Sequence, residues 1–233
     1  MANKKRVLLK ISGELFQSEG EVVDYKKILA VANEIVKTHK DYDLGIVIGG
    51  GNIFRGRNVK ELGLNMATAH YTGMTATIVN ALALKNVLDS LNVPNRIISA
   101  LGMPDVLGSN CRISIEKHIN RGEILIFAGG TGNPYVSTDT GAVIKALEIG
   151  AEILLKGTKV MGIFDKDPKQ DSTAKQFKKL TYGEYRHISG AFILDKTAAL
   201  LAEENRLPIY VFKWGQGNLK KAVKQKAGGT IIQ

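Results

Sequence analysis

Short runs of apolar residues alternate with helix-like patterns along the whole chain. Most of the runs are flanked by Gly, Asn or Asp, and they are Arg6–Ile11, Leu44–Ile48, Arg96–Ser99, Ile124–Ala128, Ile153–Leu155 and Ile209–Phe212. A run that is apolar at nearly every position is typical of a parallel strand buried on both faces of a sheet. We therefore expect these segments to form a central, mostly parallel sheet.

Between these runs, apolar residues recur with helical spacing. A helix is expected after Asp24, which can cap it, with an apolar stripe made of Ile28, Leu29, Val31, Ala32, Ile35 and Val36. Further helices are expected over Thr75–Leu91, Asp139–Ile149 and Ala191–Asn205. The alternation predicts an α/β fold, a three-layer αβα sandwich with helices on both faces of the sheet. Because no linker, repeat or compositional break interrupts it, we expect a single domain over residues 1–233.

The composition is that of a soluble globular protein. Of the 233 residues, 44% are hydrophobic and 23% are charged, which is enough apolar material for a sizeable core. The single cysteine, Cys111, excludes an internal disulfide and a multi-cysteine metal site, and it indicates a reducing compartment. No apolar run approaches the ~18 residues of a membrane span, so we expect a cytoplasmic protein without membrane attachment.

Basic charge is concentrated in the last third of the chain. The net charge is +10, from 32 basic and 22 acidic side chains, and residues 156–233 carry +8 of it. Nucleic-acid-binding proteins usually add aromatic residues or a reading helix to such a surplus. Here the lysines are spread over a polar loop and the polar face of a short helix: Lys175, Lys178, Lys179, Lys220, Lys221, Lys224 and Lys226. A solvated surface is the favoured interpretation, and nucleic-acid binding is the alternative.

Glycine-rich segments follow three of the expected strands. They are KISGE at residues 10–14, GGGNIFRG at residues 49–56, and GGTGNP at residues 129–134, which continues to Asp139. Glycine lets backbone N–H groups approach an anion closely, and ligands bind at the carboxyl ends of strands in open α/β sheets. Each segment alone can be a tight turn. Three together, with Lys10 and Arg55 among them, favour a polyphosphate ligand.

Signatures of several other enzyme classes are missing from the sequence. It contains no GxxxxGK[ST] loop, no GxGxxG turn after a strand, no HExxH and no serine-nucleophile elbow. The histidines, His39, His70, His118 and His187, are too scattered to suggest a metal site. Phosphoryl transfer fits the glycine-rich segments and their basic residues, because this chemistry depends mainly on positioning and on cations that neutralise the phosphates.

Three lysines and one aspartate are candidates for that charge chemistry. Lys10 ends the first strand, and Lys156 and Lys159 follow the run that ends at Leu155. Asp139 begins a helix and can hold such lysines in place or position metal-bound water, whereas a plain N-cap is its alternative interpretation. A solvated loop lysine is the alternative interpretation for Lys159.

These segments resemble the bacterial uridylate (UMP) kinases of the amino-acid-kinase fold. The resemblance runs from Arg6 to Ile232, and its strongest pieces are LLKISGE, VIGGGNIFRG, GMTATIVNALAL, AGGTGNPYVSTDT, LLKGTKVMGIFDKDP and LPIYVF, in the family's order. The GTGNP…TD segment separates this family from relatives that phosphorylate carbamate, glutamate or aspartate. The resemblance implies Mg²⁺-dependent transfer of the ATP γ-phosphoryl group to UMP, giving UDP and ADP in pyrimidine-nucleotide biosynthesis. A related kinase acting on a carboxylate or carbamate is the alternative.

The resemblance also assigns roles to individual positions. On the ATP side it places Lys10, Ile11, Ser12, Gly13, Gly51, Arg55, Thr158, Phe164 and Asp167. On the UMP side it places Gly50, His70, Thr131, Gly132, Asn133, Pro134, Tyr135, Val136, Ser137 and Thr138. Lys10 and Lys159 are implied to stabilise the transferring group, with Lys159 chosen over Lys156, and Asp139 to organise the catalytic lysines. No metal ligand from the protein is implied.

Two departures from the family pattern stand out. His70 replaces a family aspartate, and it offers one hydrogen bond in place of two carboxylate oxygens, so weaker UMP binding is expected. Residues 18–23, SEGEVV, replace a glycine-aromatic stretch associated with activation by GTP. The family further implies a homohexamer inhibited by UTP, in which Thr75–Leu91 is a contact helix or else part of the core.

Overall fold

A sheet with helices on both faces forms the frame of the chain. The computed structural model describes residues 4–55, 63, 65–104, 106–109, 112–168, 170–188 and 193–233. Its strands are β1 (Arg6–Ile11), β2 (Asp43–Ile48), β3 (Asn95–Ser99), β4 (Gly108–Ser109), β5 (Ile124–Ala128), β6 (Ile153–Thr158), β7 (Lys179–Leu180), β8 (Ile209–Lys213) and β9 (Thr230–Ile232). They lie in the order β4-β3-β5-β2-β1-β6-β8-β9-β7. Cys111 lies outside the described residues.

The sheet is mostly parallel, as the sequence predicts. Among the described strands, β8 and β9 pair antiparallel and every other neighbouring pair is parallel. All six expected strands are present, although β6 continues beyond the expected Leu155 to Thr158. The short strands β4, β7 and β9 were not predicted, because two or three residues are too few to show a period.

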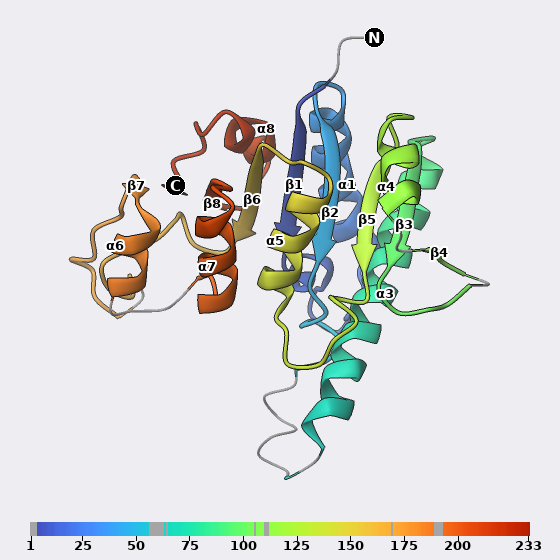
Figure 1. Ribbon diagram of the computed structural model, residues 1–233, viewed down its shortest axis with the longest axis horizontal. Helices are drawn as coiled ribbons and strands as arrows, with labels where there is room; N and C mark the ends of the chain where they lie inside the picture. Colours follow the sequence, from blue (N-terminus) through green and yellow to red (C-terminus); the bar gives the residue numbers. More distant parts are fainter. Residues whose placement is uncertain are drawn as a thin grey trace.

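Two layers of helices enclose the sheet (Figure 1). The helices are a 3₁₀ turn η1 (Gly13–Phe16), α1 (Tyr25–His39), α3 (Met66–Ser90), α4 (Arg112–Ile119), α5 (Thr138–Glu148), α6 (Tyr182–His187), α7 (Lys196–Glu204) and α8 (Asn218–Val223). One buried cluster joins α1, α3 and α8 to one face of the sheet, and a second joins α4, α5, α6 and α7 to the other. The three-layer αβα arrangement is thereby confirmed. No helix in the described part of the chain is long and apolar enough to cross a membrane.

The central strands are apolar throughout because both of their faces are covered. In β1, Val7, Leu9 and Ile11 belong to the cluster under α1 and α3, whereas Leu8 belongs to the cluster under α5 and α7. Successive residues of a strand point to opposite faces, so each face receives every second side chain. A sheet of this kind fixes the positions of its strand ends.

Helix α3 begins nine residues before the expected start, at Met66 in place of Thr75. Asn65 caps it, since its side chain accepts a hydrogen bond of 3.0 Å from the backbone N–H of Thr68. The additional turns, MATAHYTGM, carry small and polar residues without an apolar stripe, which explains why the pattern did not reveal them. These turns reach the edge of the sheet where the candidate site lies.

Helix α7 begins later than expected, at Lys196 in place of Ala191, a position outside the described residues. Asp195 is its N-cap, with the side chain accepting a hydrogen bond of 2.9 Å from the N–H of Ala198. Ile193 and Leu194, directly before this cap, are not helical, and Ile193 and Asp195 contact the site described below.

The last basic segment forms a short helix, as expected from the spacing of its lysines. Helix α8 contains Lys220 and Lys221, and Lys224 is its C-cap. Lys220 lies 2.7 Å from Asp41 at the end of α1, with both side chains half exposed. The basic charge of this region lies at the surface.

The three glycine-rich segments all lie at one edge of the sheet. They follow β1, β2 and β5, which are mutually parallel, so their carboxyl ends point the same way. The segment after β6 reaches this edge as well, because β6 is parallel to β1. Residues far apart in the sequence therefore meet there.

Candidate active site

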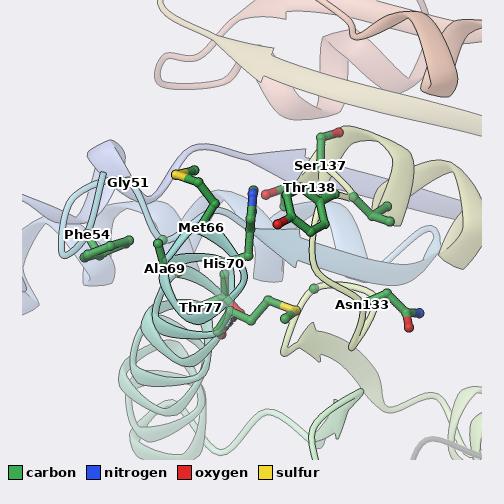
Figure 2. A pocket seen from close by; sticks show the side chains of 15 residues that line it. Gly51, Phe54, Met66, Ala69, His70, Thr77, Asn133, Ser137 and Thr138 are labelled. Carbon is green, nitrogen blue, oxygen red and sulfur yellow. Dashed lines mark hydrogen bonds between the residues drawn. The ribbon is translucent and has the colours of Figure 1, made fainter. Parts of the chain in front are cut away.

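A cavity of about 510 Å³ opens at this edge between the first turns of α3 and the segment after β5. Its lining comes from three places in the chain: Gly50, Gly51 and Phe54; Met66, Ala69, His70, Gly73, Met74 and Thr77; and Gly130, Asn133, Tyr135, Val136, Ser137 and Thr138. Figure 2 shows Phe54 on one side of α3, and Asn133, Ser137 and Thr138 on the other. A pocket of this size holds a small organic ligand.

Most of the residues assigned to the UMP side by resemblance line this cavity. They are Gly50, His70, Asn133, Tyr135, Val136, Ser137 and Thr138. Thr131, Gly132 and Pro134 belong to the same segment but are not among the described lining residues. Gly51, which was assigned to the ATP side, lies at the same cavity.

The glycine at position 50 lets α3 approach the loop after β2. A Cβ atom placed on Gly50 would lie 2.8 Å from the carbonyl oxygen of Gly73 and 2.9 Å from the Cβ of Ala76. Real Cβ atoms do not approach other atoms so closely, so any larger residue at position 50 would push the helix away. Gly50 therefore sets the width of the cavity at this point.

A buried pair of amides fixes the same loop from below. Asn52 and Asn80 exchange hydrogen bonds of 3.1 and 2.8 Å between their side chains. Asn80 also donates to the carbonyl oxygen of Gly49, and Asn52 donates to that of Val22. Because buried amides are costly when they lack partners, this reciprocal pair holds the loop in one position against α3.

The rings of His70 and Tyr135 are in contact at the wall of the cavity. Their ring centroids are 4.8 Å apart and the rings are inclined by 54°. Tyr135 has a φ of +65° and is 72% exposed, so most of its ring faces solvent. The residue that departs from the family pattern thus contacts both the cavity and the segment that closes one side of it.

Two lysines and an aspartate form a charged cluster directly behind Thr138. Lys10 and Lys156 occupy paired positions of β1 and β6, so their side chains leave the sheet on the same face. Asp139 lies between them: its Oδ1 is 2.8 Å from Lys10 Nζ, and its Oδ2 accepts a hydrogen bond from Lys156 Nζ. Exposure is 15% for the Lys10 and Asp139 side chains and 7% for Lys156.

Asp139 can contact both lysines because another residue, Ser137, caps α5. Ser137 is the N-cap, and its Oγ accepts hydrogen bonds of 3.1 Å from the N–H groups of Asp139 and Thr140. Asp139 is therefore the second residue of the helix, and its carboxylate contacts lysines, not the helix backbone. The plain N-cap interpretation does not hold for Asp139.

The cluster shifts the acidity of its members. Burial raises the pKa of the Asp139 carboxyl, but Lys10 and Lys156 lower it more, so its pKa lies below the ordinary value. Burial lowers the pKa of Lys156 to about 8; repulsion from Lys10 contributes, and Asp139 opposes the shift. Near neutral pH, two lysines and one carboxylate leave a surplus of positive charge.

Residues just before α7 complete the surroundings of the cluster. The carbonyl oxygen of Ile193 accepts a hydrogen bond from Lys156 Nζ. Asp195 accepts hydrogen bonds from Ser137 Oγ and, at 3.1 Å, from Thr140 Oγ1. Asp195 thus ties the start of α5 to the start of α7. Neither residue was predicted from the sequence, although an aspartate before the run KTAALLA is a recognisable N-cap.

Lys159 lies elsewhere, beside the loop after β1. Its Nζ is 2.6 Å from Glu14 Oε2, and its side chain is 63% exposed. The other oxygen of the same carboxylate, Oε1, accepts a hydrogen bond of 2.6 Å from Arg55 Nη2. Hydrogen bonding to Lys159 lowers the pKa of Glu14, with attraction to Lys159 and Arg55 adding to the effect and burial opposing it.

The remaining ATP-side residues lie at the ends of β1 and β6 or in the segment that follows β6. Ile11 is buried in β1, so its backbone alone can face a ligand, and Ser12 caps the 3₁₀ turn that starts at Gly13. Thr158 ends β6, where its Oγ1 donates a hydrogen bond of 2.7 Å to the carbonyl oxygen of Val160. Phe164 and Asp167 are half-buried in the segment that follows.

Comparison with known proteins agrees with this arrangement. The model of the amino acid kinase family matches residues 5–213, which is most of the chain. The chain belongs to the amino acid kinase family. Uridylate kinases of Rickettsia bellii and Xanthomonas campestris are each 40% identical to it over 232 residues; the matches cover 98% of this chain, and 97% and 96% of those proteins.

Solved structures of members of this family have the same fold. The UMP kinase from Ureaplasma parvum superposes with a TM-score of 0.94 at 35% identity, covering 99% of both chains. The UMP kinase from Bacillus anthracis gives a TM-score of 0.93 at 34% identity, covering 99% of this chain and 96% of the other. The predicted amino-acid-kinase fold is therefore confirmed.

The cavity residues that the sequence analysis missed come mainly from the additional turns of α3. They are Met66, Ala69, Gly73 and Met74, together with Phe54, Thr77 and Gly130. In this family member, a helix start hidden by small residues supplies a third of the lining, His70 included. The sequence signal that could have revealed it is Asn65 as an N-cap.

Proposed function

We propose that this protein is a UMP kinase, which transfers the γ-phosphoryl group of MgATP to UMP and forms UDP and ADP. The observation that carries the proposal is the cluster of Lys10, Lys156 and Asp139 immediately behind Thr138 at the end of the cavity. The similarity of the protein to uridylate kinases over nearly the whole chain supports UMP as the acceptor.

The reaction needs little covalent help from the protein. An oxygen of the UMP phosphate attacks the γ-phosphorus, the bond to the β–γ bridging oxygen breaks, and ADP leaves with that electron pair. No general base is required, because the second pKa of a phosphate monoester is about 6 and the attacking oxygen is already largely deprotonated. The obstacle is repulsion between two anionic phosphates, which fixed cations reduce.

Lys10 and Lys156 supply those cations. Both are held by Asp139 in positions set by the strand register, so they stabilise charge without rearranging. The family resemblance implied Lys159 as the second catalytic cation, but the contact of Lys159 with Glu14, in the loop after β1, favours a donor-side role for it. We therefore assign Lys156 to the transferring phosphoryl group and Lys159 to the phosphates of ATP.

The acceptor and the donor occupy neighbouring parts of the sheet edge. UMP fits the cavity between α3 and residues 130–138, with His70 and Tyr135 beside it. ATP lies across the loops after β1, β2 and β6, where it meets Ser12, Gly13, Gly51, Arg55 and Lys159, with Thr158, Phe164 and Asp167 beyond. This assignment puts the γ-phosphate of ATP next to Lys10.

Mg²⁺ fits here as a companion of the nucleotide. The carboxylate in the cluster, Asp139, has both oxygens in contact with lysines. The ion prefers phosphate oxygens and water as ligands, and it lowers the charge of the polyphosphate when bound. MgATP is therefore the form of the donor that this set of side chains suits.

The family resemblance extends the proposal to assembly and location. We expect a cytoplasmic homohexamer in which UTP inhibits the enzyme. Residues 18–23 depart from the family pattern associated with activation by GTP, and Ser18 and Glu21 form an isolated antiparallel bridge there.

A panel of acceptors tests the proposed function. UMP, CMP, glutamate, aspartate and carbamate are offered separately with MgATP, and ADP release is measured with and without GTP and UTP. We expect rapid turnover with UMP and at least about tenfold slower turnover with every other acceptor, because a site built for hydrogen bonds rejects ligands that leave them unpaired. ADP release that is faster with any other acceptor would overturn the assignment.

The acidity of Lys156 predicts an alkaline limit to activity. With a pKa of about 8 in the free enzyme, Lys156 carries its charge below that pH and loses it above. The value of kcat/KM for MgATP, which reports on the free enzyme, should therefore fall as pH rises through about 8. Lys156→Arg, which stays charged, should remove this limb at some loss of rate. A wild-type profile that stays level to pH 9.5 would contradict the expectation.

A further inference from the structure

One carboxylate connects three loops at the donor side of the site. Glu14 belongs to the 3₁₀ turn after β1; its Oε1 is 2.6 Å from Arg55 Nη2, and its Oε2 is 2.6 Å from Lys159 Nζ. Arg55 follows β2 and Lys159 follows β6. Since β1 lies between β2 and β6 in the sheet, Glu14 occupies the middle position and reaches to both sides.

The three side chains differ in how firmly they are held. Arg55 is 59% exposed and Lys159 is 63% exposed, so neither is fixed by packing, whereas Glu14 is 23% exposed. Arg55 also donates a hydrogen bond of 3.1 Å from its Nε to the carbonyl oxygen of Gly51. Long, exposed cationic side chains lose considerable rotamer freedom when a ligand orders them. Contact with Glu14 orders both before any ligand arrives.

We propose that Glu14 is a positioning residue for the donor, holding Arg55 and Lys159 so that both point at the bound polyphosphate of MgATP. The inference rests on the proposed function for the identity of the donor, MgATP. It adds to that function a residue that determines how tightly the donor binds. Glu14 itself acts through the two cations and does not touch the reacting atoms. Its effect therefore belongs in donor binding and not in the chemical step.

An ordinary surface ion pair would behave differently. Exposed pairs contribute little to stability, and breaking one changes neither substrate affinity nor turnover. The chain offers such a pair for comparison: Lys5 and Glu152 are 2.6 Å apart with exposures of 68% and 52%, and they precede β1 and β6 at the opposite edge of the sheet. Glu152→Ala is thus a matched control that removes one exposed carboxylate from a lysine.

The test measures MgATP binding directly by calorimetry, together with steady-state kinetics with UMP. We expect Glu14→Ala to weaken MgATP binding and to raise KM for MgATP by about tenfold, with kcat and KM for UMP changed by less than about twofold. Glu14→Gln, which keeps the size and one acceptor oxygen, should lie between the wild type and Glu14→Ala. Glu152→Ala should match the wild type.

A combined variant checks that Glu14 acts through its two partners. In a protein that carries Arg55→Met and Lys159→Met, adding Glu14→Ala should weaken MgATP binding by less than about twofold, because the side chains that Glu14 positions are gone. Unchanged or tighter MgATP binding in Glu14→Ala would overturn the inference, and so would a full tenfold loss in the combined background. Calorimetry does not depend on the acceptor, so failure of UMP as substrate would overturn the proposed function and leave this result standing.

Discussion

Replacing Lys10 by alanine lowers kcat at saturating MgATP and UMP by at least about 100-fold, because one strong donor to the transition state is worth that much. Lys10 is 15% exposed and is held by Asp139 at 2.8 Å, so water cannot easily take its place. The loss should appear mainly in kcat, since the interaction strengthens as charge develops on the transferring group. Steady-state kinetics measure it directly.

The control for this variant is Lys5→Ala. Lys5 lies just before the same strand, but its side chain is 68% exposed and its partner, Glu152, is a surface residue. We expect wild-type kinetics from Lys5→Ala and a thermal unfolding midpoint within a few degrees of wild type for both variants. A nearly normal kcat in Lys10→Ala would remove Lys10 from the proposed mechanism.

Replacing Gly13 by alanine destabilises the protein by about 3 kcal/mol, through overpacking of a buried site. An added Cβ would lie 2.7 Å from the Nδ2 of Asn80, and it would be closer still to the Oδ1 of Asn52 and the carbonyl oxygen of Gly49. Backbone and reciprocally bonded amides cannot move aside without breaking the hydrogen bonds that hold the loop after β2. Urea denaturation gives the loss in the free energy of unfolding.

Gly13→Ala should also reduce activity at temperatures where it remains folded, because the displaced loop carries Gly50 and Gly51 at the cavity. Gly183→Ala is the comparison, since a Cβ there would meet one atom, the Oγ1 of Thr181, at 3.8 Å. It lies inside α6, where alanine is favoured over glycine by about 1 kcal/mol, so it should be neutral or stabilising. Equal stability of the two variants would show that the contact around Gly13 is not tight.

The sequence predicted the parts of the fold that depend on local patterns. The six longer strands follow from continuous apolar runs, and the helices follow from apolar residues at helical spacing. A parallel sheet covered by helices on both faces requires both patterns. The starts of α3 and α7 did not follow, because small residues in one and a capping aspartate in the other decide them. His70 lies in the first turns of α3 and Asp195 is the N-cap of α7, so both missed boundaries lie at the site.

The proposed assignment of Lys156, in place of Lys159, to the transferring phosphoryl group rests on information that no local sequence pattern holds. Both lysines lie within four residues, LLKGTK, and either can be reached by a phosphate in a loop. The register between β1 and β6 separates them, since it places Lys156 opposite Lys10. Register depends on contacts between strands more than 140 residues apart, and no local pattern contains it.

The pairing of Lys10 with Lys156 has a consequence for inactivation by heat. Both lysines are part of central strands of the sheet, so their spacing persists until those strands separate. Local opening on heating begins in segments with few buried contacts, such as the one that carries the exposed Tyr135. We therefore expect activity lost below the temperature of global unfolding to be lost because the substrate-holding segments open. Such activity should return on cooling, since the sheet has stayed folded.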